Sequence, residues 1–543
     1  MDTSFYDKLS GLDITIIIGY LIFVVLLGLY FGSKHKDAED YFLAGRSLTW
    51  PLIGFSLFAS NMSSNTLVGL TGSGFKDGFS VFSYEWMAVF VLIIFAVFLL
   101  PYYLKNKIFT VPEYLEKRYS YFSRAFASGI AIVLNIFVDV AATLYAGGVL
   151  IQLVFPQFEL WQIIVVLSII AGLYTISGGL SAVVYTDAIQ AVILILGSCL
   201  ITYIAWDQSG GFAEVMKITD PTHMDIIKSA SDESLPWPAL IGVFLLGFYF
   251  WGTNQYITQR TLASKSKTEG QWGAMFAGLL KLSILFIMIF PGVFARVLYP
   301  DWNTEEMDKL YPTMLFDLLP NGLLGLVVAG FIAALMSSID SGLNSVSTLF
   351  TMDFYTKLRP GKTQEELLKV GRWVTLTIMI IATAWAPQIV HFDKLWDYLQ
   401  AALSWFCPPV LAMFIMGLFW KGANSKGALW AVIVGVPISI YAMLTSLHEF
   451  FPGGFGDALG SLNAASPHFL YMTVIHFVIC CLAIVFGSKT GTGKSAAELT
   501  NVVWTPAEYQ AETAEIANLP WYKNYRYQGL ALVIIVIIIL LIY

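Results

Sequence analysis

The stretch SLFASNMSSNTLVGLTGSG at residues 56–74 places polar side chains in the middle of an apolar run that is long enough to cross a membrane. A second stretch, FLLGFYFWGTNQYITQR at 244–260, is interrupted in the same way, because Gly247 and Gly252 flank a cluster of aromatic residues. Backbone freed by an unwound helix is tolerated at membrane depth only where it lines a cavity or a binding site. Two interrupted spans at corresponding positions are typical of transporters built from inverted repeats, and kinked helices with a purely structural role are the alternative.

The composition of the chain is that of a polytopic membrane protein. Of the 543 residues, 57% are hydrophobic and only 12% are charged, against about half and about a quarter in soluble proteins. The net charge of −7 provides no basic surface that could neutralise phosphates, which argues against nucleic-acid binding. The cysteines lie in apolar stretches, which favours structural thiols over a disulfide framework or a zinc site; they are Cys199, Cys407, Cys480 and Cys481.

The number of spans follows from the length of the apolar stretches. A bilayer core needs about 20 mostly apolar helical residues, and counting such stretches predicts an all-α protein with fourteen transmembrane helices. The expected spans are 14–32, 50–75, 80–104, 121–155, 160–177, 182–206, 238–262, 270–299, 321–355, 368–390, 392–420, 426–448, 468–487 and 526–543.

Loops on the two sides of this membrane differ in their content of basic residues. One set holds most of the loop lysines and arginines, whereas the other carries only Lys8, Lys76, Lys217, Lys228 and Lys309. This asymmetry follows the positive-inside rule. It predicts a multi-pass protein of the cell membrane, plasma or inner, with both termini outside.

The two interrupted spans are five spans apart, and this spacing divides the chain. It predicts one inverted repeat at 50–206 and a second at 238–420. Residues 1–49 are expected to form the first transmembrane helix and an inside loop, and residues 421–543 to form three C-terminal transmembrane helices. Within the last part, the inside segment 488–525 is polar and predicts a mobile tether.

That segment opens close to GSKTGTGKS at 487–495, which resembles a phosphate-binding loop. Such a loop needs glycine in place of Ser488, a strand before it and a nucleotide-binding domain around it. A membrane span precedes it here instead, so the sequence does not support an ATPase.

Polar residues recur in the ninth span at intervals of three and four, which places them along one face of a helix; they are Ser337, Asp340, Ser341, Asn344, Ser345 and Thr348. Hydroxyl and carbonyl oxygens are the hard ligands that a small cation prefers, and a carboxylate adds charge compensation. Serine and threonine also join packed membrane helices, but the acid in mid-span favours a cation.

The other ionisable or amide side chains within the spans are Glu85, Asp139, Asp187, Lys281, Asp397 and Gln400. A neutral polyol needs a pocket of mixed donors and acceptors, because each hydroxyl both gives and takes a hydrogen bond. Such a mixture, with one acid and one base that can cancel, is available from Asn61, Glu85, Lys281 and Gln400. The apolar face of a sugar ring has candidate partners in Phe250, Trp251 and Trp396. Taken singly, each polar residue could instead form a structural contact between helices.

With these residues identified, the sequence resembles the sodium/solute symporter family and, within it, the sodium/sugar cotransporters. The supporting runs are DYFLAGRSLTWPLIG at 40–54, ASNMSSNTLVGLTGSGF at 59–75, SYEWMA at 83–88, SGGLSAVVYTDAIQ at 177–190, YFWGTNQYITQRTLASKS at 249–266, AALMSSIDSGLNSVSTLFTMDFY at 333–355 and DYLQAALSWFCPPVLAMFIMGLFWKG at 397–422. The resemblance implies a LeuT-like core of two inverted five-helix repeats with alternating access around a central sugar site.

The resemblance also assigns residues to the sugar site. It places the family's sugar ligands on Asn61, Glu85, Lys281 and Gln400. The aromatic residue that closes the inner side of the site is usually tyrosine and is Phe250 here, next to Trp251. Thr66 stands where sugar transporters often carry glutamine or histidine. These departures leave the identity of the sugar open.

For sodium, the coupling ion, the resemblance implies one core site and a possible second site. The core site consists of the backbone carbonyls of Ala59, Met62 and Ala334 and the hydroxyls of Ser337 and Ser338. The possible second site consists of Asp187, Asp340 and Ser341, and a structural aspartate at position 340 is the alternative.

The sequence therefore predicts a symporter that couples sodium entry to the uptake of a small-molecule sugar across the lipid bilayer. Inositol or another small polar solute is the alternative substrate, and a non-transporting sugar sensor has the same pattern. A membrane enzyme would need a nucleophile with a base, or a metal constellation, within the spans. Only His476 lies in mid-span among the histidines, outside both repeats, so no enzyme is predicted.

Overall fold

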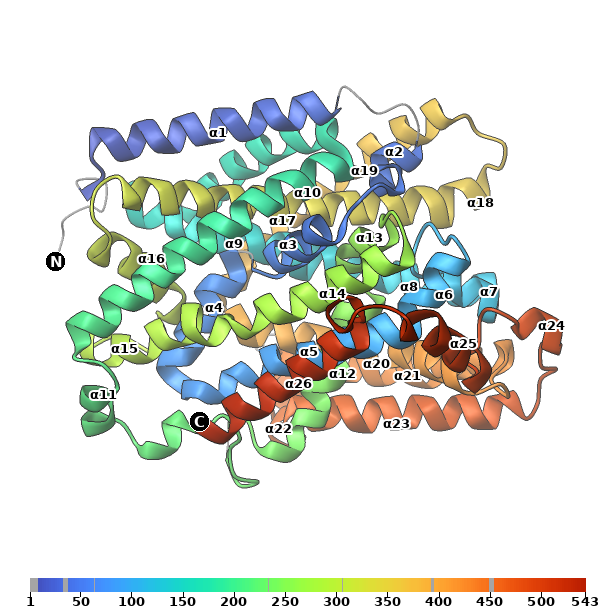
Figure 1. Cartoon of the computed structure of the whole chain (residues 1–543). Helices are drawn as coiled ribbons and strands as arrows, with labels where there is room; N and C mark the ends of the chain where they lie inside the picture. Colours follow the sequence, from blue (N-terminus) through green and yellow to red (C-terminus); the bar gives the residue numbers. More distant parts are fainter. Residues whose placement is uncertain are drawn as a thin grey trace.

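The structure is a computed structural model that describes residues 8–32, 38–62, 64–232, 234–304, 306–391, 395–448 and 454–543. These residues form a bundle of helices, most of which run along one common direction (Figure 1). Ten helices within the described ranges are long and apolar enough to cross a membrane. The prediction of an all-α polytopic membrane protein is confirmed at this level. Ser63 of the first polar stretch lies outside the described residues.

Helices occupy the predicted spans of the first half of the chain. They are α1 (Gly11–Gly32), α3 (Trp50–Asn61), α4 (Ser64–Asp77), α5 (Ser83–Ile94), α6 (Leu100–Lys105), α8 (Tyr121–Leu134), α9 (Ala141–Val154), α10 (Leu160–Ser209), α12 (Leu240–Phe248) and α13 (Gln255–Leu262). Two predicted spans fall within α10, and Gly179 separates them because its φ of 55° and ψ of 178° are not helical.

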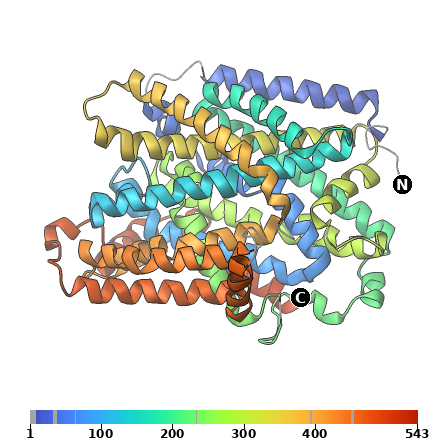
Figure 2. The same ribbon diagram turned by 180° about the vertical axis from the view of Figure 1, so that it is seen from behind.

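The second half has α14 (Lys267–Leu282), α15 (Phe290–Leu298), α17 (Leu323–Leu349), α18 (Thr356–Leu358), α19 (Gln364–Trp385), α20 (Leu395–Phe419), α21 (Ser425–Ser446), α23 (Phe469–Ser488) and α26 (Tyr525–Ile542). The helices that lie between these span segments are α2 (Ala38–Leu43), α7 (Glu113–Arg118), α11 (Phe212–Ile218), α16 (Met307–Leu318), α22 (Gly454–Ala465), α24 (Ala496–Leu499) and α25 (Pro506–Ala517). The start of α1 and the end of α26 lie toward the same end of the bundle (Figure 1). From behind, α20, α21 and α23 lie side by side (Figure 2).

Both interrupted spans are broken helices, as predicted. The first break follows Asn61, where Met62 has a non-helical φ of −80° and ψ of 52°. In the second, α12 continues as a π-helical turn at Tyr249–Thr253 and ends at Asn254, which is extended with φ −80° and ψ 123°. The Asn254 side chain then accepts the backbone N–H of Tyr256 at 3.0 Å and starts α13.

Other long spans carry π-helical turns between their halves. These turns are Phe95–Leu99, Asn135–Val140, Leu285–Ile289 and Phe350–Tyr355. A π turn leaves the regular hydrogen-bond ladder and is frequent at functional sites. Two of these turns belong to spans that carry an intramembrane charge. Asp139 lies within the turn Asn135–Val140, and Lys281 lies in α14 before the turn Leu285–Ile289.

Close backbone packing holds both halves of the first broken span against α14 and α15. A Cβ atom on Gly273 of α14 would lie 2.5 Å from Ile53 Cγ2 of α3. A Cβ atom on Gly292 of α15 would lie 2.1 Å from the carbonyl oxygen of Thr71 of α4. Only glycine fits at such contacts, which join α14 to α3 on one side of the break and α15 to α4 on the other.

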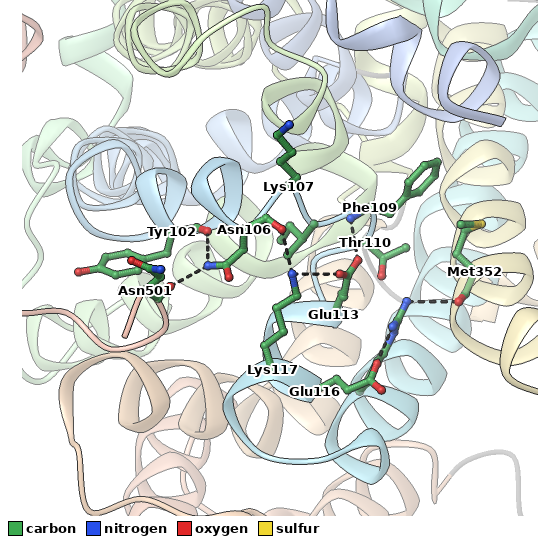
Figure 3. A network of polar contacts seen from close by, with 12 residues as sticks. Tyr102, Asn106, Lys107, Phe109, Thr110, Glu113, Glu116, Lys117, Met352 and Asn501 are labelled. Atoms are coloured by element: carbon green, nitrogen blue, oxygen red, sulfur yellow. Dashed lines mark hydrogen bonds and ion pairs between the residues drawn. The ribbon is translucent and has the colours of Figure 1, made fainter. Parts of the chain in front are cut away.

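The segment 488–525 differs from the mobile tether that its composition predicts, because it contains α24 and α25 and is docked on the ends of the spans. Asn106 donates to the carbonyls of both Tyr102 and Asn501, at 2.8 and 2.7 Å (Figure 3). The Tyr114 hydroxyl donates to the Val502 carbonyl at 2.6 Å. Backbone and carboxylate groups of the segment find partners on the bundle, which is why it folds there.

Candidate solute and cation sites

A cavity of about 80 Å³ lies where the two broken spans meet. Its lining includes all eight residues expected to bind the solute: Asn61, Thr66, Glu85, Phe250, Trp251, Lys281, Trp396 and Gln400. They come from α3, α4, α5, α14, α20 and the π turn after α12. The structure therefore brings together residues that are up to 339 positions apart, counting from 61 to 400.

Three of these residues contact one another in the cavity. The Lys281 ammonium forms an ion pair with Glu85 and donates to the side-chain carbonyl of Asn61. The Lys281 and Glu85 side chains are only 1% and 2% exposed, so their charges compensate each other out of water. The ammonium also lies 5.2 Å from the centre of the Trp251 ring, a favourable cation–π position.

Aromatic rings form the other walls. Phe250 and Trp251 meet edge to face with centroids 5.4 Å apart. Trp396 meets Tyr84 in the same manner at 5.3 Å. Thr66 donates to the Asn61 carbonyl at 2.5 Å and so closes part of the backbone break. These rings offer apolar faces beside a small number of polar groups, as ligand pockets commonly do.

The sequence did not assign a role to four other lining residues: Tyr84, Asp139, Thr143 and Tyr256. Tyr84 directly precedes Glu85, and Asp139 is a mid-span acid with Thr143 one turn later, so position alone could have indicated them. Within the part of the chain that the structure describes, the Oδ2 atom of Asp139 is buried without a hydrogen-bond partner. The Tyr256 hydroxyl donates to the Ser60 carbonyl at 3.0 Å.

The size of the cavity constrains its use. Pockets for small ligands usually measure about 300–1,000 Å³, whereas this one measures about 80 Å³. A solute of sugar size therefore needs this cavity to widen, and the mutual contacts of Lys281, Glu85 and Asn61 are polar contacts that a solute could replace.

The residues expected at the core sodium site lie together on α3 and α17, which pack against each other. Ala59 and Met62 are at the end of α3, where the last carbonyls of a helix have no partner within it. Ala334, Ser337 and Ser338 are buried on α17. The Ser337 hydroxyl donates to Asp187 of α10, so one expected ligand of the core site touches one of the possible second site.

Arg260 connects much of this polar cluster, and the sequence analysis did not single it out. Its guanidinium donates to the Ser341 hydroxyl at 2.6 Å and to the Ser56 hydroxyl at 2.7 Å, and it lies 3.4 Å from Asp187 Oδ2. Its place as an arginine at the end of the second interrupted stretch was the available sequence signal, and in the structure it is fully buried.

Two of the three residues of the possible second site share one partner, because Asp187 and Ser341 both lie against Arg260. Asp340, one position before Ser341 on α17, is also buried.

Comparison with known proteins now decides the family. The model of the sodium:solute symporter family matches residues 41–435. The chain belongs to the sodium:solute symporter family. It is 34% identical to rabbit sodium/glucose cotransporter 1 (Oryctolagus cuniculus), covering 88% of this chain and 79% of the relative. It is 37% identical to the sodium/glucose cotransporter of Vibrio parahaemolyticus, covering 80% and 85%.

Three further proteins are similar to the chain in sequence or in fold. Sodium/myo-inositol cotransporter 2 of the rabbit is 32% identical, covering 94% of this chain and 82% of the relative. A substrate-bound, outward-open sodium-coupled sialic acid symporter has the same fold, with a TM-score of 0.76, 25% identity and coverage of 90% and 99%. The nucleobase-cation symporter Mhp1, at 12% identity and a TM-score of 0.52 with coverage of 87% and 99%, shares the fold alone.

Membership of the sodium:solute symporter family establishes the class of activity. The protein is a membrane transporter and not an enzyme, and it couples the movement of a solute to the movement of sodium.

Proposed function

We propose that this symporter imports a neutral, glucose- or galactose-like sugar together with sodium by alternating access. The observation that supports this most directly is the shared cavity of Asn61, Glu85, Lys281 and Gln400. Its acid and base are paired, so the pair adds no net charge that would select an ion. Amide, carboxylate and ammonium groups together supply the donors and acceptors that sugar hydroxyls need, and Trp251 and Trp396 supply apolar faces.

Inositol is the second candidate solute, favoured by the sodium/myo-inositol cotransporter among the relatives. Phe250 carries no hydroxyl that could distinguish one polyol from another, and Thr66 has a short side chain that already bonds to Asn61. A sugar sensor without transport is the third possibility. Direct measurement of uptake separates these three.

We assign the coupling sodium to the carbonyls of Ala59, Met62 and Ala334 and the hydroxyls of Ser337 and Ser338. The support is their common position beside the first helix break. We assign a second cation to Asp187, Asp340 and Ser341. This assignment requires the Ser341 hydroxyl to leave Arg260.

For the architecture, we propose fourteen membrane crossings in the cell membrane, inverted repeats at 50–206 and 238–420, and both termini outside. The two broken spans support the repeats. An even number of crossings agrees with the first and last helices beginning and ending toward the same end of the bundle (Figure 1).

Uptake into proteoliposomes tests the solute and the site together. The purified protein should take up labelled glucose or galactose under an inward sodium gradient and not under a potassium gradient, and a panel with inositol ranks the solutes. Gln400→Ala should weaken solute affinity about tenfold, because a buried polar group left unpaired costs on the order of 1–3 kcal/mol. Gln152→Ala is the matched control, since Gln152 lies on α9 outside the cavity. Unchanged affinity in Gln400→Ala would contradict the site.

A further inference from the structure

A surface groove of about 600 Å³ lies between α3, α14 and α26. Aromatic side chains form much of its wall, among them Trp50 of α3, Trp272 and Phe276 of α14, and Tyr527 of α26. Leu279 belongs to its aliphatic part. The groove shares no lining residue with the solute cavity.

The groove opens toward the hydrocarbon of the bilayer. α26 and the helix that contains α14 are both apolar enough to span a membrane. Leu279 beside the groove is 46% exposed, and Leu530 and Ile534 of α26 are 54% and 48% exposed. In a membrane-spanning helix, exposed side chains of this kind face lipid, so an acyl chain is the neighbour available to fill the groove.

One end of the groove lies at the membrane–water interface. Trp521, Tyr522 and Lys523 come directly before α26 and line this end. Tryptophan and tyrosine concentrate at the headgroup level, and Trp521 is 75% exposed. The rim is also held in place, because the Trp272 indole donates to the Lys523 carbonyl at 2.8 Å.

The charge at this rim is not compensated by the protein. Among the described residues that line the groove, Lys523 is the only charged one, and no described acidic residue forms an ion pair with its ammonium. Arg526, one turn later, differs because it pairs with Glu512 at 3.1 Å. A single available cation above an apolar groove complements a negative headgroup above an acyl chain.

We propose that this groove binds one phospholipid with an anionic headgroup, its phosphate at Lys523 and one acyl chain along Phe276 and Leu279. The proposal needs only the membrane location of the protein and is independent of which solute is transported.

This lipid would contact the helices that carry the sites. The Phe276 ring packs edge to face against Trp50 and Phe55 of α3, at 5.3 and 5.0 Å between centroids. The same α14 carries Lys281, and α3 ends at Asn61. A lipid in the groove would therefore contact the packed pair α3 and α14 beside α26, and we expect lipid composition to affect the rate of transport.

Native mass spectrometry of the purified full chain tests the binding, with phosphatidylglycerol and phosphatidylcholine as the probes. The parent should retain one phosphatidylglycerol about fivefold more tightly than phosphatidylcholine, the preference expected for one lysine near an anionic surface. Lys523→Gln should reduce phosphatidylglycerol to the level of phosphatidylcholine. Ala531→Trp, which fills the groove, should reduce both.

Lys426→Gln is the matched control, because Lys426 is an exposed lysine of α21 that donates to the Thr490 carbonyl and does not line the groove. It should bind lipid as the parent does. Equal retention of the two lipids by the parent would overturn the proposal, and so would full retention in Ala531→Trp. Lys523 is at the surface and its replacement is compatible with folding, which the melting temperature verifies.

Transport in vesicles provides the second measurement. Phosphatidylglycerol added to phosphatidylcholine vesicles should change the uptake rate of the parent and of Lys426→Gln, and should have no effect on Lys523→Gln. An identical response in all three proteins would contradict the lipid site. Loss of sodium-dependent uptake in every lipid would count instead against the proposed function, so the two failures are distinguishable.

Discussion

We expect solute binding to depend directly on Lys281 and Glu85, which form an ion pair in the cavity. Removing one member of a buried ion pair leaves an uncompensated charge and costs about 3–5 kcal/mol. We therefore expect Lys281→Met to lower the melting temperature and abolish uptake. The double variant Glu85→Gln with Lys281→Met should recover most of the stability and none of the uptake, as measured by thermal unfolding in detergent and by proteoliposome transport.

The double variant is the decisive control for that prediction. It separates a loss of stability from a loss of solute contacts, since both of its side chains are neutral. Wild-type uptake in the double variant would show that the pair is structural only and has no part in recognising the solute.

Ser337 is the second residue whose replacement we expect to change transport. Its hydroxyl touches Asp187 and lies at the proposed core sodium site. Loss of one hydroxyl contact costs on the order of 1 kcal/mol or more, so Ser337→Ala should raise the sodium concentration for half-maximal uptake roughly fivefold to tenfold. Ser345→Ala is the matched control, because Ser345 is also buried on α17. Its uptake should reach half its maximum at the same sodium concentration as in the parent. The same sodium dependence of uptake in Ser337→Ala and in the control would mean that Ser337 does not bind the sodium ion.

At this scale the sequence predicted which residue types line the cavity, and it did so partly through the family resemblance. Polar side chains in apolar spans are costly and so stand out. The partners of each residue could not be predicted, because they depend on helix rotation. Arg260 shows this, because its guanidinium reaches Ser341, Ser56 and Asp187 on three different helices.

Among the elements, α25 makes the contacts that hold the docked segment 488–525. Glu512 accepts from Gln271 at 3.0 Å and pairs with Lys267 and Arg526. Burial opposes its ionisation, but the Gln271 hydrogen bond and the Lys267 charge outweigh burial and hold the pKa of Glu512 below its ordinary value of 4.5. A lowered pKa in the docked state stabilises docking above the ordinary value, and this contribution is lost as the pH falls through the lowered pKa.

We therefore expect Glu512→Gln to loosen α25 at neutral pH. Hydrogen exchange of residues 506–517 should become faster, while exchange in α14 stays unchanged. Glu515→Gln is the control, because Glu515 also contacts Lys267 but is 63% exposed, and exposed pairs contribute little. Equal protection of α25 in the two variants would mean that contacts made by the residues before α25 hold it instead. These are the bond from the Trp504 N–H to the Leu418 carbonyl and the bond from Asn106 to the Asn501 carbonyl.

The two helix breaks were predictable from sequence, whereas the docking of α25 was not. A break leaves a local signal, since polar or glycine residues interrupt an apolar run. Docking depends on partners far away in the chain, such as Asn106 for Asn501 (Figure 3) and Lys267 for Glu512. A polar segment with such partners has the same composition as one without them.

For the whole molecule, the ratio of cations to solute sets the gradient that transport can sustain. Each sodium that crosses about 100 mV contributes about 2.3 kcal/mol, and a tenfold gradient adds about 1.4 kcal/mol. With a second cation at Asp187, Asp340 and Ser341, we expect a ratio of two, falling toward one in Asp340→Ala and in Ser341→Ala. Reversal potentials or paired tracer fluxes measure it.

A parent ratio of one, without proton movement, would leave Asp340 as a structural residue. If only Ser341→Ala lowers the ratio, the second site consists of the residues that already share Arg260.

The glycine contacts of α14 and α15 have a further consequence for the whole molecule. Gly273 and Gly292 hold α3 and α4 against one helix pair that bridges their break, so the backbone that presents Asn61 and Lys281 is ordered before a solute arrives. Ordering flexible groups on binding costs conformational entropy. Because the broken helix is already fixed on both sides, this cost is met during folding, and the solute's binding free energy remains available to exchange the cavity's own hydrogen bonds.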